Sequence, residues 1–266
     1  ASVIQHLKSK FEISQMDVQC FIGLQIVRDQ SKRWMHLNQS SFTKRLLERF
    51  GMIKAKSLST PFDIHQKLGK NGPPDGLTHA TINVPFREAI GALLFLSQGT
   101  RPDISYAVNF LARFSSEPKK AHWTAVKRIF QYLSQDTTIG ISFSGSNQPN
   151  IMTAYCDADY GGNIDTRHST TGYIALFNNG PVIWQSKKQR TVAASTVEAE
   201  IVAACLACRD LIWMRQLLTE IGRPVKSPSI LHIDNQGAIE LSKSNQINER
   251  TKHIDIKYML IQEAIK

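Results

Sequence analysis

The sequence predicts an α/β protein with a mainly helical first region, over residues 1–145, and a mixed sheet flanked by helices over residues 146–266. Three observations support this prediction. The chain has 266 residues, 42% of them hydrophobic and 20% charged, which is enough for two modest domains with a core each. Apolar residues recur at helical spacing between residues 86 and 135. After residue 150 the pattern changes to short strand-like runs separated by turn residues.

A small β-hairpin is expected near the start of the chain. The apolar run VQCFIGLQIV, at residues 18–27, suits one buried strand, and residues 34–37 are expected to pair back on it after a polar turn. Residues 40–50 then carry apolar side chains at helical spacing and are followed by a glycine, so they predict a helix. Residues 57–84 are rich in proline and glycine and have no periodicity, which indicates a loop.

Three further helices are predicted, over residues 86–98, 103–114 and 119–135. A proline stands just before the second and the third, where its fixed backbone angle favours the start of a helix. The third helix has apolar residues on one face and also carries a basic group, which consists of Lys119, Lys120, Lys127 and Arg128. A basic face above an apolar one suits a phosphate backbone, and it is equally ordinary for a helix exposed to solvent.

The polar stretch at residues 144–150, SGSNQPN, is the predicted boundary between the two regions. Three strand-like runs follow it, at residues 151–159, 173–177 and 182–186. The pair Asn179-Gly180 lies between the second and the third run and is typical of a tight hairpin turn. These three runs therefore predict consecutive strands, the last two joined as a hairpin.

Basic residues gather around this hairpin, and we predict that they contact phosphate; a merely solvated surface is the alternative. This second basic group consists of Arg167, Lys187, Lys188 and Arg190. Trp184, in the third strand, either stacks on a sugar or base or belongs to the core.

A long helix is predicted over residues 196–221. A short strand at residues 230–233 follows it, and then two helices at residues 236–243 and 254–265. The second region thus reads as three strands, a helix, a strand and two helices. This order predicts a mixed sheet with helices on its faces.

Three acidic residues stand at the ends of these predicted elements. Asp157 lies near the end of the first strand, Glu198 in the first turn of the long helix, and Asp234 directly after the fourth strand. Carboxylates that converge in this way repel one another unless a cation lies between them. Ligand sets made of oxygen alone select hard ions such as Mg²⁺ or Mn²⁺, and two such ions can promote phosphodiester hydrolysis.

Each acid also has a simpler interpretation. Ser195-x-x-Glu198 matches a capping box, in which the glutamate only satisfies a backbone N–H at the helix start. Asp234-Asn235 is compatible with a turn or a helix cap. Asp157 has an acidic neighbour, Asp159, on the same side of the strand, and either one is compatible with a solvated position.

The charge of the chain favours a polyanionic partner. Lysine and arginine number 32 against 22 aspartates and glutamates, a formal net charge of +10, and nucleic acid is the commonest polyanion. The four cysteines include the pair Cys205-x-x-Cys208 without a second ligand pair at metal spacing, which favours packed thiols in a reducing compartment. No apolar run approaches the ~20 residues of a membrane span, and no signal peptide is visible. We therefore expect an intracellular protein without a membrane partner, and not a secreted one.

The second region resembles the ribonuclease H domain of copia-type LTR retrotransposon Pol polyproteins. The similar segments are YCDADYGGNIDTRHSTTGYIALFNNGPVIWQSKKQRTVAASTVEAE, LHIDNQGAIELSKS and ERTKHIDIKY. The first region resembles the end of the reverse transcriptase of the same polyproteins, with its palm edge, thumb and connection, in FIGLQIV, TPFD, AIGALLFLSQGTRPDISYAVNFLARF and HWTAVKRIFQYL. The resemblance runs in order over nearly the whole chain.

This resemblance implies a ribonuclease H-like fold over residues 146–266 and metal-dependent cleavage of the RNA strand of RNA–DNA hybrids. It implies that Asp157, Glu198 and Asp234 bind two Mg²⁺ or Mn²⁺ ions. The implied partners are an RNA–DNA hybrid and the upstream reverse transcriptase palm of the same polyprotein.

Two departures from the family pattern bear on activity. The Asp-Asp motif of the polymerase is absent, so we expect the polymerase site to lie outside this chain. The family continues past the last predicted helix to a fourth carboxylate, so we expect the second region to be truncated and do not assign that role to Asp255. His253 is a further candidate, for proton transfer or for a structural role. The alternative to a nuclease is a catalytically incomplete or domesticated fragment that acts as a nucleic-acid-binding or structural module.

Overall fold

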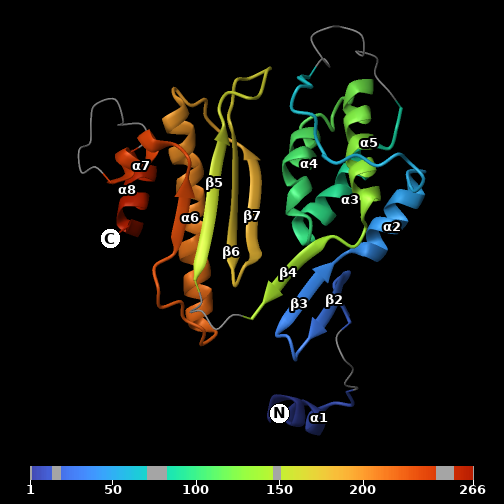
Figure 1. Ribbon diagram of the computed structural model, residues 1–266, viewed down its shortest axis with the longest axis vertical. Coiled ribbons are helices and arrows are strands. Elements are labelled where there is room, and N and C mark those ends of the chain that lie inside the picture. Colours follow the sequence, from blue (N-terminus) through green and yellow to red (C-terminus); the bar gives the residue numbers. More distant parts are fainter. Residues whose placement is uncertain (1, 14–18, 71–82, 146–150, 244–254, 266) are drawn as a thin grey trace.

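The computed structural model of the protein describes residues 2–13, 19–70, 83–145, 151–243 and 255–265. These residues form two four-stranded sheets with helices on their faces (Figure 1). The predicted α/β class is therefore confirmed. Among these described residues, no helix combines the length and the apolar character needed to cross a membrane.

The first sheet is antiparallel throughout and has the order β1-β2-β3-β4. Its strands are β1 (Cys20–Phe21), β2 (Leu24–Asp29), β3 (Trp34–Asn38) and β4 (Gly140–Ser144). The single strand predicted over residues 18–27 is wrong, because Ile22 and Gly23 have φ values of 49° and 79° and turn the chain back on itself. The predicted pairing of residues 34–37 back on this segment is confirmed, because β3 is antiparallel to β2. The strand β4, which was not predicted, then pairs with β3 from beyond α5.

Helices form the bulk of the first region, as predicted. They are α1 (Ser2–Lys10), α2 (Ser40–Arg49), α3 (Phe86–Gly99), α4 (Ser105–Ala112) and α5 (Lys120–Gln135). The helix expected over residues 103–114 begins as a 3-10 turn, Pro102–Ile104, before α4. The apolar faces of α2 to α5 meet in one core, whose fully buried members include Leu93, Leu96, Ile129, Phe130 and Leu133. The loop predicted over residues 57–84 lies partly outside the described residues, which omit 71–82.

The second sheet is mixed and has the order β7-β6-β5-β8. Its strands are β5 (Met152–Asp159), β6 (Thr170–Phe177), β7 (Gly180–Lys188) and β8 (Ile230–Ile233). The strand β8 runs parallel to β5, and the other pairs are antiparallel. The hairpin turn predicted at Asn179-Gly180 is displaced by one residue: Asn178 and Asn179 have the positive φ values, 50° and 61°, and Gly180 already pairs with Phe177.

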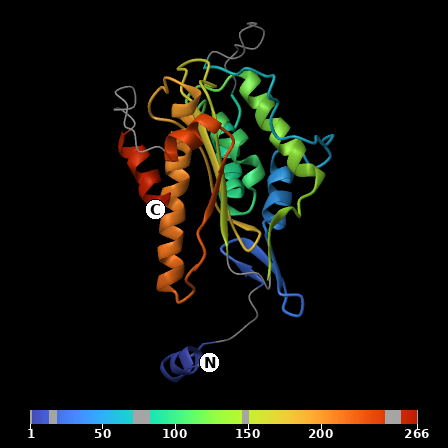
Figure 2. The same cartoon turned by 60° about the vertical axis from the view of Figure 1, so that its left-hand side comes forward.

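The long helix α6 (Thr196–Glu220) packs across β5 and β6, and α7 (Gln236–Lys243) and α8 (Asp255–Ile265) lie beside it. Figures 1 and 2 show the second sheet between these helices and the helices of the first region. Along β5, alternate residues from Met152 to Ala158 are buried, whereas Tyr155, Asp157 and Asp159 are exposed. The predicted order of strands and helices in this region is confirmed.

Direct contacts join the two regions. The indole N–H of Trp184 in β7 donates to the carbonyl oxygen of Ser97 at 2.7 Å. The guanidinium of Arg113 donates to Thr170 Oγ1 at 3.0 Å. The helices of the first region therefore cover part of the second sheet, and hydrogen bonds of these side chains span the junction. The linker that contains the predicted boundary lies outside the described residues at positions 146–150.

Candidate metal centre

Three carboxylates converge at one edge of the second sheet. They belong to Asp157, Glu200 and Asp234, and one oxygen of each lies within 4.8 Å of the others. Asp157 and Asp234 are exposed and Glu200 is buried. The structure thus brings together two of the three acids predicted from the sequence, with Glu200 as the third member.

Strand pairing explains how Asp157 and Asp234 meet. The strands β5 and β8 are parallel neighbours, and Cys156 is the register partner of Ile233. The two aspartates each follow one of these partners, so they emerge side by side where both strands run in the same direction. Parallel strands present their carboxyl ends at the same edge of a sheet, which is where such sites commonly lie.

Glu200 reaches this edge from the second turn of α6. Its side chain is 5% exposed. Its Oε1 accepts the backbone N–H of Ala158 at 3.2 Å, while its Oε2 is buried and has no hydrogen-bond partner among the residues that the structure describes. Burial, followed by the nearby negative charge of Asp157, raises the pKa of Glu200 to about 7. A buried carboxylate oxygen without a partner is costly, and a cation between the three acids would relieve that cost.

The prediction that Glu198 belongs to this cluster is wrong. Glu198 caps the helix: its Oε2 accepts the backbone N–H of Ala194 at 2.7 Å, and its own N–H donates to Ser195 Oγ at 3.1 Å. An α-helix turns by about 100° per residue, so two residues two positions apart point in nearly opposite directions. The capping-box spacing of Ser195 and Glu198 was the sequence signal that this glutamate is used at the helix start.

The other acids near the cluster have separate roles or places. Asn235, rather than Asp234, caps α7, because its Oδ1 accepts the backbone N–H of Ala238 at 2.9 Å. Asp159 lies outside the cluster, and the Tyr106 hydroxyl approaches its Oδ2 at 3.4 Å. His253 and the side chain of Asp255 lie outside the described residues.

A cavity of about 660 Å³ opens beside Asp157, between β5–β7 and the start of α4. Aromatic side chains from both regions line it, namely Tyr106, Tyr155, Tyr173 and Trp184. Tyr155 also stacks on His232, with ring centroids 4.6 Å apart and planes inclined by 13°. Because these two residues are cross-strand partners on β5 and β8, the stack lies next to the acids. Sequence reasoning missed both His232 and this pairing, which depends on the register of distant strands.

The two predicted basic groups lie apart. In the α5 group, Lys119 pairs with Glu117 at 2.7 Å, and Arg128 donates to Thr60 at 2.8 Å and lies 3.9 Å from Asp63. Lys120 and Lys127 are exposed. Figure 1 shows α5 on the far side of the helical layer from β5 and α6, so this group is distant from the three acids.

The basic group of the second region is more concentrated. Lys187, Lys188 and Arg190 at the end of β7 line a cavity of about 410 Å³ together with Arg209 of α6. Arg167 is exposed on the loop between β5 and β6 and has a positive φ of 55°. Sequence reasoning missed Arg209 because it joins the group only through the packing of α6 on the sheet.

The chain is similar to three retrotransposon polyproteins. It is 40% identical over 262 residues to the retrovirus-related Pol polyprotein from transposon TNT 1-94 of Nicotiana tabacum, which is 97% of this chain and 20% of that protein. It is 34% identical to the Pol polyproteins from transposons RE2 and RE1 of Arabidopsis thaliana, over 98% and 100% of this chain and 17% and 18% of those proteins.

No protein-family model matches the chain, and no solved structure matches it. The chain spans about a fifth of the length of the polyproteins that it matches. The similarity covers nearly all of its residues, in agreement with the resemblance of its sequence segments. The chain therefore belongs to the family of copia-type retrotransposon Pol polyproteins.

Proposed function

We propose that the chain contains a ribonuclease H-type endonuclease that cleaves the RNA strand of RNA–DNA hybrids. The observation that carries this proposal is the convergence of Asp157, Glu200 and Asp234, with one oxygen of each within 4.8 Å of the others. Three carboxylates gathered at one sheet edge offer the oxygen ligands that divalent cations bind, and divalent cations promote phosphodiester hydrolysis.

The donor set fits Mg²⁺ or Mn²⁺. All three side chains offer oxygen, which hard cations prefer, and Glu200 Oε2 is a buried acceptor without a hydrogen-bond partner in the described part of the chain. We propose that these three residues hold two such ions. When bound, the ions would activate water and stabilise the charge that develops on the scissile phosphate.

The residues around the acids suit a nucleic-acid substrate. Lys187, Lys188, Arg190 and Arg209 gather at the end of β7 and would bind phosphates of the hybrid, and exposed Arg167 would add a further contact. The Tyr155–His232 stack lies beside Asp157 and Asp234 and offers an aromatic surface to a sugar or base. Ala158 N–H donates to both Asp157 Oδ1 and Glu200 Oε1, which holds the two acids in place.

We further propose a ribonuclease H-like fold for residues 146–266 and the C-terminal end of a reverse transcriptase, with palm edge, thumb and connection, for residues 1–145. The mixed sheet, with β8 parallel to β5 and α6 across it, supports the first assignment, and the separate first sheet and helical core support the division. The reverse transcriptase palm of the same polyprotein is the proposed partner, and the interior of the cell the proposed location.

Cleavage of a labelled RNA–DNA hybrid in the presence of Mg²⁺ or Mn²⁺ tests the proposal. Asp157→Asn removes one anionic ligand with little change of shape and should reduce cleavage at least about 100-fold. Asp159→Asn is the matched control, because Asp159 lies two residues along the same strand and outside the cluster. Equal cleavage by the two variants would contradict the assignment.

A second function is favoured by the net charge of +10: binding of nucleic acid without cleavage. Measurement of Mn²⁺ binding separates the two functions without relying on activity. A nuclease should bind Mn²⁺ in a manner abolished by Asp157→Asn and should cleave hybrid. A binding module should hold the hybrid with the same affinity whether or not the metal and the Asp157 carboxylate are present.

A further inference from the structure

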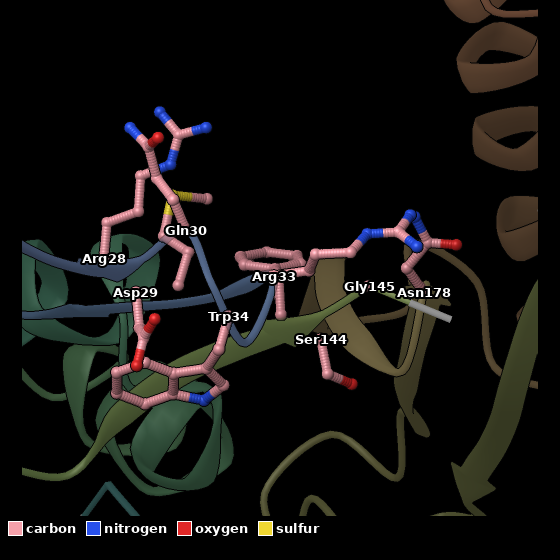
Figure 3. Close-up of a pocket in the computed structure, with 10 residues that line it drawn as sticks. Arg28, Asp29, Gln30, Arg33, Trp34, Ser144, Gly145 and Asn178 are labelled. Carbon is pink, nitrogen blue, oxygen red and sulfur yellow. The ribbon is translucent and has the colours of Figure 1, made fainter. Parts of the chain in front are cut away.

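A cavity of about 540 Å³ is lined by residues of both sheets (Figure 3). It lies at the end of the second sheet opposite the three acids, where β4 approaches the β6–β7 hairpin in Figure 1. Three segments contribute to it: the β2–β3 hairpin, the end of β4, and Asn178 in the turn between β6 and β7. This junction cavity thus draws on both regions of the chain and is separate from the candidate metal centre.

One face of the first sheet forms a wall of the junction cavity, and this wall carries arginine side chains. Arg28 is the register partner of Met35, and Met35 is the partner of Phe143, so the three side chains form a row across that face. Arg33 stands at the end of the hairpin turn beside this row. Figure 3 shows Arg28 and Arg33 on either side of the cavity, with the guanidinium of Arg33 directed toward Asn178.

Among the described residues that line the junction cavity, the one acidic residue, Asp29, faces away from Arg28. Asp29 is the partner of Trp34, in the neighbouring row, and alternate residues of a strand point to opposite faces. Figure 3 shows Asp29 and Trp34 on the other side of the strands from Arg28. The carboxylate of Asp29 is engaged there by Ser31 Oγ at 2.6 Å and by the backbone N–H of Lys32 at 3.1 Å.

Local geometry holds Arg33 in place. Its φ is 50°, a left-handed conformation that is uncommon for a residue with a side chain, and its carbonyl oxygen accepts the N–H of Gly145 at 2.6 Å. The side chain lies over Gly145 so closely that a Cβ there would be 2.7 Å from Arg33 Cβ and Nε. The backbone of Arg33 and the start of its side chain are therefore held against Gly145, the residue that follows β4.

Half-buried Met35 and Phe143 supply an apolar surface between the two arginines. Guanidinium groups bind phosphate, and an aromatic or apolar surface accepts an unstacked base. In a duplex the bases are stacked and paired, so an exposed base is a property of a single strand. We propose that the junction cavity binds single-stranded nucleic acid, with phosphates at Arg28 and Arg33 and a base against Phe143 and Met35.

The choice of nucleic acid as the ligand rests on the proposed function, in which the chain acts on nucleic acid. The junction cavity itself does not involve the three acids. Fluorescence anisotropy with a short labelled single strand tests the proposal in the full chain. The double variant Arg28→Gln/Arg33→Gln should weaken binding about tenfold or more. It should also lower the slope of log affinity against log salt by about 0.7 for each phosphate that the variant no longer neutralises.

Matched controls distinguish binding at the junction cavity from nonspecific attraction of nucleic acid to the positive charge of the chain. Lys44→Gln/Arg45→Gln removes two exposed positive charges from α2 and should leave affinity nearly unchanged. Gly145→Ala removes no charge but displaces Arg33, so it should weaken binding, whereas Gly91→Ala, where a Cβ meets nothing within 4 Å, should not. Equal weakening in the two double variants, or no binding of the single strand by the parent chain, overturns the proposal.

Competition with other phosphates identifies the source of the ligand. A mononucleotide or inorganic phosphate that competes as well as the single strand would assign the cavity to a free nucleotide or ion and overturn the nucleic-acid occupant. Asp157→Asn should retain binding at the junction cavity, and Arg28→Gln/Arg33→Gln should retain Mn²⁺ binding at the acids. Failure of one site with survival of the other therefore distinguishes this inference from the proposed function.

Discussion

Asp157 and Glu200 share one backbone donor: the N–H of Ala158 lies 2.8 Å from Asp157 Oδ1 and 3.2 Å from Glu200 Oε1. Two carboxylates that accept the same N–H are held close together, and their mutual repulsion is only partly offset. This arrangement connects the end of β5 to α6 and creates a place for a cation. It also determines what each substitution in the cluster should do.

Glu200→Gln is expected to raise the thermal stability of the metal-free chain while abolishing stabilisation by Mn²⁺. At pH 8, above the Glu200 pKa of about 7, the substitution removes a buried negative charge beside Asp157. It should then raise Tm by about 2–4 °C, which corresponds to about 1 kcal/mol for a chain of this size. A ligand that binds only the folded state raises Tm as its concentration increases. Thermal melts with Mn²⁺ and with a chelator check both expectations. The same Mn²⁺-induced rise in Glu200→Gln as in the parent would exclude Glu200 as a ligand.

Glu198→Ala is expected to have the opposite pattern. It removes the acceptor of Ala194 N–H and should destabilise the chain by about 1 kcal/mol, the usual effect of losing a helix cap. The rise of Tm with Mn²⁺ should persist, since the three clustered carboxylates remain. Glu198→Gln, which keeps an acceptor oxygen, should restore most of the stability. If Glu198→Ala stays folded but its Tm no longer rises with Mn²⁺, Glu198 is a ligand of the metal after all.

The stability of the first region should fall in mild acid because of His122. This side chain is fully buried, stacks on Phe114, accepts the N–H of Lys119 at Nδ1 and has Nε2 2.9 Å from the carbonyl oxygen of Gly69. Burial is the main cause that lowers its pKa below 6.5. A histidine whose folded-state pKa is lowered favours the neutral form, so its contribution is fully present above pH 6.5 and is lost as the pH falls from there through the lower folded-state pKa.

Urea unfolding between pH 8 and pH 5 measures this effect. His122→Asn keeps an acceptor near the N–H of Lys119 but does not titrate in this range. It should be less stable than the parent at pH 8, by about 1–3 kcal/mol because the ring and its bond to Gly69 are removed. It should also show a smaller decline toward pH 5. An undiminished decline in the variant would assign the acid sensitivity to other groups.

Gly180→Ala should destabilise the contact between the two sheets. A Cβ at this position would lie 2.3 Å from Phe143 Cδ1 and 2.6 Å from the carbonyl oxygen of Ser142, so β4 and β7 would have to separate. Such overpacking typically costs about 1–3 kcal/mol. Gly172→Ala, in the neighbouring strand β6, is the matched control, because a Cβ at Gly172 meets nothing within 4 Å. Chemical denaturation measures the free energy of unfolding of both variants. Equal values would show that the two sheets can move apart without cost and would contradict the prediction.

The sequence by itself determined the class of the protein and most of its helices and strands. Helical and alternating patterns are properties of consecutive residues, so residues 40–50, 86–98, 196–221 and 230–233 were placed correctly from local spacing. It also identified Asp157 and Asp234 as acids at strand ends. The two aspartates lie close together because β5 and β8 are parallel neighbours. The order of strands and helices in the sequence predicted the mixed sheet to which both strands belong.

Tertiary structure decided the features that depend on residues far apart in the chain. The choice between Glu198 and Glu200 depends on which side of α6 faces the sheet, because a helix rotates by about 100° per residue. Strand β4 carries little signal of its own and exists because β3 offers it a hydrogen-bonding edge. The junction cavity needs two turns, at Arg33 and at Asn178, brought together by the close approach of Phe143 to Gly180. Local patterns specify the conformation of a segment. A site is assembled by packing between segments, and the local sequence of one segment does not indicate which distant segment it will contact.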